Sequence, residues 1–291
     1  MRDRPRLPSA PKTVVAGAFL APSLLGLATF FLVPFLDVVR RSFTNTSGTQ
    51  FVGLDNYATV LGNDAFALAA GNTARFMGVC IPLLLALSLL IALALRKATP
   101  FRRLMKTALL LPLAIPVFTA ALLINVTFDV NGLANGMLAA MGANPASWLD
   151  GDAAFWVLVG NYIWRNLGYC IVLWLAALSC IPESLYEAAR VDGAGSWLIA
   201  RRITLPLVAP SCFVVTVLAI INAFKVYREA YLVAGSYPPE SMYLIPHLFN
   251  NWFASLSVGK LAAGGVLLGA ALLVIVAALF CAWGTHDGEG R

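Results

Sequence analysis

The side chains that most often carry out chemistry are scarce in this sequence. The two histidines, His247 and His286, are far apart, so neither an HExxH zinc motif nor a cluster of histidine ligands is available. The five cysteines fall within or at the edges of apolar segments and form no CxxC pair, which is typical of small buried hydrophobic residues. The pair Gly259-Lys260 lacks the upstream glycine of a Walker A loop. The residue pattern therefore favours neither a metalloenzyme nor a nucleotide hydrolase.

A few polar residues interrupt long apolar segments. Arg165 is the single charged residue in the segment 153–180, and Tyr169 lies four residues later, which places it on the same face of a helix. A charged group near the interior of a bilayer is costly, so its side chain is expected to face protein or water. We predict that Arg165 and Tyr169 border a cavity. Arg165 has two other interpretations, in which it extends towards lipid phosphate or pairs with an acid.

The composition indicates which elements must position these residues. The chain has 291 residues, of which 60% are hydrophobic and only 12% are charged, whereas soluble domains are about 25% charged. Because roughly 20 apolar residues cross a bilayer, we predict an all-α polytopic membrane protein with one transmembrane domain over residues 13–284. The six predicted spans are 13–36, 76–95, 107–128, 153–180, 203–224 and 261–284. Pro112 and Pro116 are expected to bend the third span.

The basic residues predict the orientation of the spans. Most of the 20 Lys and Arg residues lie in the segments 1–12, 96–106 and 190–202, which an even number of spans places on one side of the membrane. Loops rich in Lys and Arg face the cytoplasm, so both termini, residues 1–12 and 285–291, are predicted to be cytoplasmic tails. The bases are scattered among membrane flanks instead of forming one patch, which argues against a nucleic-acid partner.

The cytoplasmic loop 183–206 has a pattern of its own. Ser184 and Glu187 have the spacing of a capping box and predict a short helix. Gly193 and Gly195 allow that helix to stop and turn, because glycine tolerates left-handed conformations. A second short helix is expected over 196–202, and Pro206 can open the fifth span without losing a needed hydrogen bond. The predicted helix-turn-helix either protrudes from the membrane or folds back on the bundle.

This loop resembles a known family signature. Its fixed positions are Glu187, Ala188, Ala189, Gly193, Ile203, Leu205 and Pro206. That spacing matches the EAA signature of the membrane subunits of bacterial ABC importers, and the stretch 188–195 is similar to carbohydrate permeases of the maltose and glycerol-3-phosphate type. The segments 51–57 and 111–116 extend the resemblance along nearly the whole chain.

The resemblance implies a fold, partners and a location. The fold is that of a type I ABC importer permease with a cytoplasmic EAA coupling helix, in a multi-pass protein of a bacterial cell membrane. The implied partners are a second permease subunit that completes a heterodimer, two cytoplasmic ATPases that bind ATP and Mg²⁺, and an extracellular or periplasmic sugar-binding protein. No cofactor is expected on this chain. The residues implied in coupling to the ATPase are Glu187, Ala188, Ala189, Asp192, Gly193, Gly195, Ile203, Leu205 and Pro206.

The resemblance also implies where a sugar passes. In maltose permeases the sugar is held about halfway across the membrane by spans corresponding to the third, fourth and fifth here, and Tyr169 and Asn222 fall at such contact positions. The implied substrate pathway consists of Asn125, Trp164, Arg165, Asn166, Tyr169, Asn222 and Lys225. Arg228 is interpreted instead as a marker of the outer end of the fifth span.

Three alternatives remain open. The cations at Arg165 and Lys225 admit an anionic sugar or a polyol phosphate as the solute. An ion-coupled secondary transporter would need acids within its spans, and the acids Asp37, Asp129 and Glu229 are interpreted as lying at span edges. An intramembrane enzyme would need a catalytic dyad, which the sequence does not suggest.

Overall fold

The structure is a computed structural model that describes residues 12–96 and 99–284. Within these residues the regular structure is helical apart from one isolated bridge between Thr44 and Phe51. Five helical segments are long and apolar enough to cross a membrane, and a sixth is added if α8 and α9, which are bent by 70° at a short break, count as one span. The predicted all-α membrane fold is confirmed.

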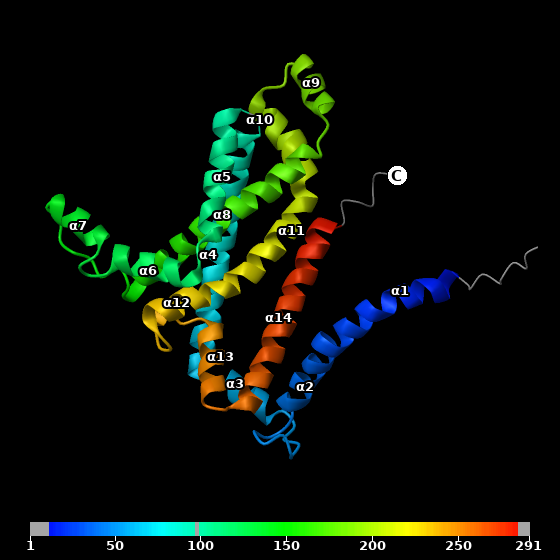
Figure 1. Cartoon of the computed structure of the whole chain (residues 1–291), viewed down its shortest axis with the longest axis vertical. Helices are drawn as coiled ribbons and strands as arrows, with labels where there is room; N and C mark the ends of the chain where they lie inside the picture. The colour runs from blue at the N-terminus through cyan, green and yellow to red at the C-terminus, as the bar shows by residue number, and fades with distance from the viewer. Residues whose placement is uncertain (1–11, 97–98, 285–291) are drawn as a thin grey trace, which may run out of the picture.

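The first span lies apart from the rest of the bundle. It consists of α1 (Lys12–Leu27), a π turn (Ala28–Leu32) and α2 (Val33–Ser42). Figure 1 shows α1 extending away from the other helices, while α2 meets the last helix, α14 (Val258–Gly284). Phe19 and Phe30 are 82% and 76% exposed, as expected for side chains that face lipid or another subunit.

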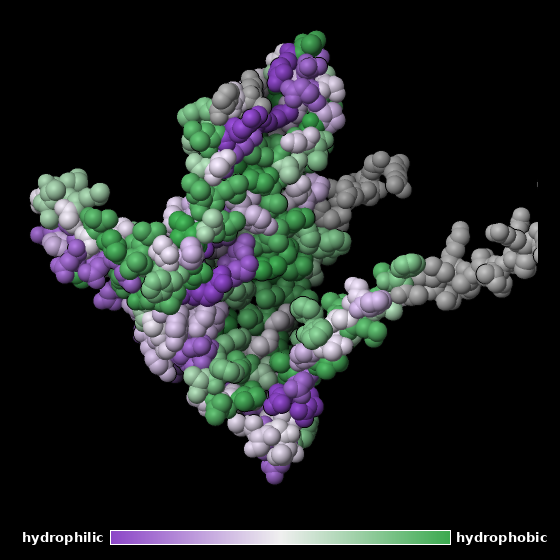
Figure 2. Space-filling view, in the orientation of Figure 1, coloured by the Kyte–Doolittle hydropathy of each residue, from purple (hydrophilic) through white to green (hydrophobic). Residues whose placement is uncertain are grey.

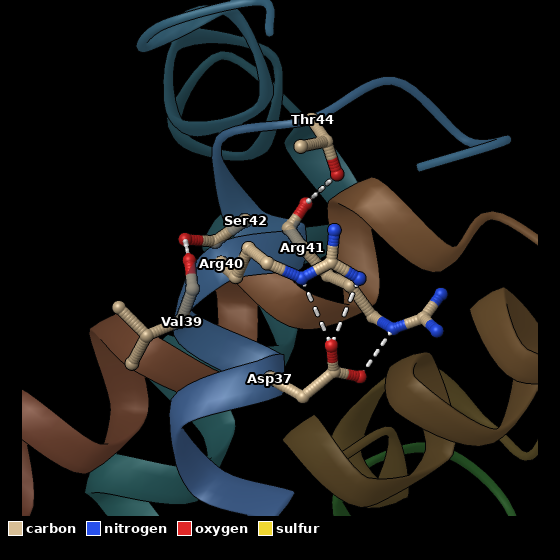
Figure 3. A network of polar contacts seen from close by, with 6 residues as sticks. All are labelled: Asp37, Val39, Arg40, Arg41, Ser42 and Thr44. Atoms are coloured by element: carbon tan, nitrogen blue, oxygen red, sulfur yellow. Dashed lines mark hydrogen bonds and ion pairs between the residues drawn. The ribbon is translucent and has the colours of Figure 1, made fainter. Parts of the chain in front are cut away.

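The helix of the first span continues past the predicted end at residue 36. Asp37 accepts hydrogen bonds from Arg40 at 2.9 Å and from Arg41 at 2.6 Å, as Figure 3 shows. Because these charged groups satisfy one another along one helix face, the charged run does not end the helix. The segment long and apolar enough to cross the membrane is therefore Phe19–Ser42 rather than 13–36.

The second span begins earlier than predicted. Its helix α4 covers Asp64–Leu95, against the expected 76–95, and follows the short helix α3 (Asp55–Leu61). The side chain of Asn63 accepts a hydrogen bond from the amide of Phe66 and caps α4. Arg75 lies within this helix because its guanidinium stacks over the ring of Phe155, 4.3 Å from the centroid.

The third span is broken rather than bent. Helix α5 (Pro100–Ala114) ends before Ile115, and α6 (Val117–Phe128) begins after Pro116, so the predicted continuous span 107–128 is wrong. Pro116 has no N–H to donate, and a residue before proline disfavours the helical region. Pro112 stays inside α5. In Figure 1, α6 and the following α7 (Leu133–Ala140) project sideways from the end of α5.

Helix α8 (Gly151–Ser179) forms the centre of the bundle and packs on α4, α5 and α11 (Leu205–Ala223). Its buried side chains include Phe155, Tyr162 and Trp174, each at most 2% exposed. The chain then passes through α9 (Glu183–Val191) and α10 (Ser196–Ile199) at one end of the molecule. After α11 follow α12 (Tyr227–Ala234) and α13 (Ile245–Ala254), of which α13 lies at the opposite end together with α3 (Figure 1).

A glycine lets α8 approach α5 closely. A Cβ atom at Gly168 would overlap the backbone carbonyl of Leu109. Overpacking of this kind costs roughly 1–3 kcal/mol, so Gly168→Ala is expected to lower the thermal unfolding temperature of the detergent-solubilised protein. The matched control is Gly160→Ala on the same helix, where a Cβ meets no atom within 4 Å. An equal unfolding temperature for both variants would contradict this close approach.

The outer helix α13 contains a buried histidine that gives stability a pH dependence. His247 is fully buried, and its Nδ1 accepts a hydrogen bond from the amide of Leu244 at 3.2 Å. Burial lowers the pKa of His247 from 6.5 to about 4. Between pH 6.5 and pH 4 the imidazole is therefore protonated in the unfolded chain but neutral in the folded protein. The free energy of unfolding should fall by about 3 kcal/mol as the pH decreases from 6.5 to 4. Thermal unfolding measured across this range checks the slope, and His247→Asn, which keeps an acceptor but does not titrate, should flatten it.

Candidate functional site

Helix α9 begins without the predicted capping box. Pro182 occupies the N-cap position with no side-chain cap, so Ser184 and Glu187 lie within the helix and the predicted reciprocal bonds are absent. Glu183 stands at the first helical position instead, where an acid is favoured by the helix dipole. Its carboxylate also accepts a hydrogen bond from Arg96 at 2.8 Å.

The end of α9 matches the predicted glycine turn. Gly193 has a φ of +79°, its amide donates to the carbonyl of Arg190, and the amide of Ala194 donates to the carbonyl of Ala189. This pair of bonds is a Schellman motif, which needs a left-handed residue at the position of Gly193. Gly195 differs from the prediction, because it has an extended conformation with a φ of −70° and precedes α10.

The second helix of the loop is the beginning of the fifth span. Helix α10 continues through a π turn (Ala200–Thr204) into α11, so the predicted separate helix over 196–202 is wrong. Pro206 in the first turn of α11 cannot donate to the preceding turn, and a π turn is one way to accommodate the missing bond. Ile203 is half-buried, and Leu205 and Pro206 are exposed.

Most of the loop residues implied in coupling are free to meet another surface. Glu187, Ala188, Asp192, Gly193 and Gly195 are exposed, and Ala189 is half-buried. Figure 2 shows that hydrophilic surface gathers at this end of the molecule. Apolar side chains interrupt it: Val191 is 88% and Trp197 75% exposed. The described residues provide no ion-pair partner for Glu187.

A polar cavity lies where the break in the third span meets α8 and the α11–α12 segment. It has a volume of about 390 Å³. Its lining includes the polar and charged residues Asn161, Tyr162, Arg165, Asn166, Asn222, Lys225, Arg228 and Glu229. In Figure 2 a hydrophilic band crosses the middle of the view over the region where α11 continues into α12, beside the hydrophobic surface of α14. The structure therefore brings together four predicted pathway residues, namely Arg165, Asn166, Asn222 and Lys225.

Arg165 joins three elements at this cavity. Its Nη1 lies 3.1 Å from Oε1 of Glu229, and their side chains are only 12% and 5% exposed. Its Nη2 donates at 3.1 Å to the carbonyl of Ile115, which lies at the break between α5 and α6. The interpretation in which Arg165 pairs with an acid is the one that the structure supports.

One acid and one cation at the cavity, Glu229 and Arg228, lie elsewhere than the sequence predicted. Glu229 was expected at a span edge and Arg228 at an outer end, but both line the cavity, and Glu229 is buried. The helix continues from α11 through a 3-10 turn (Phe224–Val226) into α12, so these residues belong to the same helical segment as Asn222. The spacing of Asn222, Lys225 and Glu229 at i, i+3 and i+7 was the signal that they share one helix face.

The cavity retains unsatisfied polar atoms. Neither side-chain atom of Asn161 has a hydrogen-bond partner, although the residue is only 7% exposed, and Oε2 of Glu229 is also unpaired. Lys225 donates to the side chain of Asn222 at 2.8 Å. Buried polar groups without partners are costly, so the cavity is suited to water or to a ligand with several hydroxyl groups. Asn161 was not predicted.

The remaining predicted pathway residues lie elsewhere. Trp164 lines a second cavity of about 610 Å³ between α6 and α8, with Trp148 and Trp156, and Asn161 borders both cavities. Asn125 and Tyr169 line neither cavity, and Tyr169 packs against the apolar core. Asn166 lines the polar cavity, but its amide donates to the carbonyl of Tyr162 in its own helix. Together the two cavities place aromatic rings beside hydrogen-bonding groups.

The family model described as "Binding-protein-dependent transport system inner membrane component" matches residues 78–284. The arabinooligosaccharides transport system permease protein AraP of Bacillus subtilis (strain 168) is 31% identical over 94% of this chain and 89% of its own length. The diacetylchitobiose uptake system permease protein NgcF of Streptomyces coelicolor is also 31% identical, over 94% of this chain and 84% of its own.

The same fold occurs in a solved transporter. A chain in the crystal structure of a bacterial ABC transporter involved in the import of the acidic polysaccharide alginate superimposes with a TM-score of 0.80. The match covers 92% of this chain and 94% of that chain at 24% identity. At this level of identity the likeness concerns the fold.

Proposed function

Because the chain belongs to the family of binding-protein-dependent transport system inner membrane components, we propose that it is a permease subunit of an ATP-driven importer whose solute is a carbohydrate. The observation that carries the proposal is α9, an exposed helix with the EAA spacing at one end of a membrane bundle. Relatives named for arabinooligosaccharides and diacetylchitobiose support the solute class.

We infer that the chain forms half of a pathway together with a second, different permease subunit. The exposed apolar faces of α1 and α2 offer surface for such a subunit. Two cytoplasmic ATPases would bind ATP and Mg²⁺ and receive α9, with Glu187 near basic residues and Ala188 and Ala189 in close contact. A binding protein would deliver the solute at the opposite end of the bundle. This arrangement places both termini in the cytoplasm of a bacterial cell.

The transport step follows from two states of the bundle. One state is open to the cytoplasm and the other to the outside, and ATP binding shifts the equilibrium between them only if it favours one state. Closure of the ATPase dimer would favour the outward-open state by moving α9 as a rigid element. The movement would open the cavities to the outside, where a sugar could stack on Trp164 and hydrogen-bond with Asn161, Asn222 and Lys225. Asn125, Arg165, Asn166 and Tyr169 complete the proposed pathway as residues that shape or support these contacts.

A single biochemical screen tests the proposal. The complex is purified with its ATPase, its second permease subunit and its binding protein, and ATP hydrolysis is measured with oligosaccharides, monosaccharides and polyol phosphates. We expect at least one oligosaccharide to stimulate hydrolysis. Stimulation by none of the three classes would overturn the carbohydrate assignment, and failure of the chain to co-purify with an ATPase would overturn the transporter assignment itself.

A further inference from the structure

Helix α9 is exposed along most of its length, but one of its side chains is buried. Tyr186 is only 2% exposed, whereas its neighbours Leu185 and Glu187 are exposed. The side chain of Tyr186 points into the bundle, because its ring lies against the guanidinium of Arg96, with the Cζ atom 3.8 Å from the ring centroid. Its hydroxyl lies 3.2 Å from Oγ1 of Thr204, which is 3% exposed.

The partners of Tyr186 belong to two different spans. Arg96 stands at the C-cap of α4, and it holds α9 at two points, through the ring of Tyr186 and through the carboxylate of Glu183 at 2.8 Å. Thr204 is the last residue of the π turn that joins α10 to α11. These contacts connect α9 to the bundle in addition to the chain segments 180–182 and 192–195.

We propose that Tyr186, held between Arg96 and Thr204, is the joint that transmits movement of α9 to the second and fifth spans. The inference rests on the proposed function, because it concerns how an ATPase bound to α9 would move the pathway. Helix α11 leads directly to Asn222 and Lys225 at the polar cavity, and α4 packs on the central helix α8. A displacement of Tyr186 therefore reaches the cavity lining directly along α11, and indirectly through the packing of α4 on α8.

The relative strength of the contacts identifies Tyr186 as the main element of this joint. The ion pair between Arg96 and Glu183 is partly exposed, with side-chain exposures of 26% and 59%, and exposed pairs contribute little. A guanidinium stacked on a buried ring is a stronger contact because one side of it is shielded from water. The π turn that ends at Thr204 is a local irregularity of the kind often found at functional positions.

The test measures a movement of the cavity without requiring the solute. In the complete complex, the five native cysteines of this chain are replaced, and Lys225→Cys is introduced as a reporter at the polar cavity. The probe is a membrane-impermeant maleimide added from the outside, with and without a non-hydrolysable ATP analogue. In the parent complex we expect the analogue to change the labelling rate. Arg96→Ala should reduce this change by about fivefold or more, the lower part of the usual range for coupled sites.

Companion variants separate transmission from folding. Tyr186→Phe keeps the ring under Arg96 and should retain most of the response, whereas Tyr186→Ala should lose it. The matched control, Arg103→Ala, removes an exposed arginine of α5 that forms no ion pair with the described residues, and it should respond like the parent. The amount of ATPase that co-purifies is recorded for each variant.

Each outcome decides the inference. A purely structural role would lower the amount of complex but leave the response per complex unchanged. A parent-like response per complex in Arg96→Ala would overturn the inference alone and leave the proposed function standing. An absent response in the parent complex, despite a bound ATPase, would overturn the proposed coupling function and this inference together.

Discussion

Replacing Gly193 with proline is expected to leave the chain inserted in the membrane and to uncouple it from ATP hydrolysis. Proline requires a φ near −65°, whereas Gly193 has a φ of +79° and donates its amide hydrogen to Arg190. The Schellman motif therefore cannot form, and the cost of about 3 kcal/mol corresponds to a shift of roughly a hundredfold in the population of the native loop. The measurement is solute-stimulated ATP hydrolysis by the reconstituted complex.

A milder variant at the same position, Gly193→Ala, serves as the control for Gly193→Pro. Gly193→Ala keeps the amide, and its Cβ meets no atom within 4 Å, so only the left-handed conformation is penalised, by about 1–2 kcal/mol. Its stimulation should lie between that of the parent and that of Gly193→Pro. If the assembled Gly193→Pro complex is stimulated as strongly as the parent, the loop geometry has no role in coupling.

Replacing Arg165 with methionine is expected to destabilise the protein more than any other single change considered. The variant leaves the carboxylate of Glu229 buried without its partner, and it removes the donor to the carbonyl of Ile115. Breaking a buried ion pair in this way costs about 3–5 kcal/mol. The unfolding temperature of the solubilised protein should fall accordingly, and uptake should fall with it because the break between α5 and α6 is no longer held.

The double variant Arg165→Met/Glu229→Met tests whether the unpaired carboxylate of Glu229 causes the loss of stability. It removes both charges and retains side-chain volume, so it should recover a large part of the stability, as pairs replaced by apolar residues often do. A double variant that is less stable than Arg165→Met would show that the charge left on Glu229 is not the cause. Lys225→Met is a suitable comparison, because Lys225 is exposed and forms no ion pair within the described residues.

In the loop, sequence reasoning described the end of α9 correctly, but not the start of α9 or the helix that follows. Gly193 was correctly placed in a left-handed turn because few other residues suit the end of a helix. The predicted cap at Ser184 was wrong because Pro182 occupies the N-cap position and Glu183 already begins the helix. The continuity of α10 with α11 depends on a π turn, which composition and spacing do not signal.

The errors at the ends of the first and fifth spans share one physical cause. Charged residues were assumed to end a span, yet Asp37 lies within a helix because Arg40 and Arg41 are one turn away. Glu229 is buried because Arg165, on another span, neutralises it. Compensation between residues of different helices is tertiary information, so the polar cavity could be predicted only in part. The buried Glu229 also removes the argument that no acid lies within a span, although one oxygen of its carboxylate already pairs with Arg165.

ATP-driven import is tested most simply by uptake of a labelled oligosaccharide into vesicles that contain the complete complex. The sugar is one that stimulates hydrolysis, the binding protein is supplied outside, and ATP is supplied inside, on the side of α9. We expect accumulation that requires both ATP and the binding protein and is lost with Gly193→Pro. Accumulation driven by a proton or sodium gradient in the absence of ATP would contradict ATP-driven import.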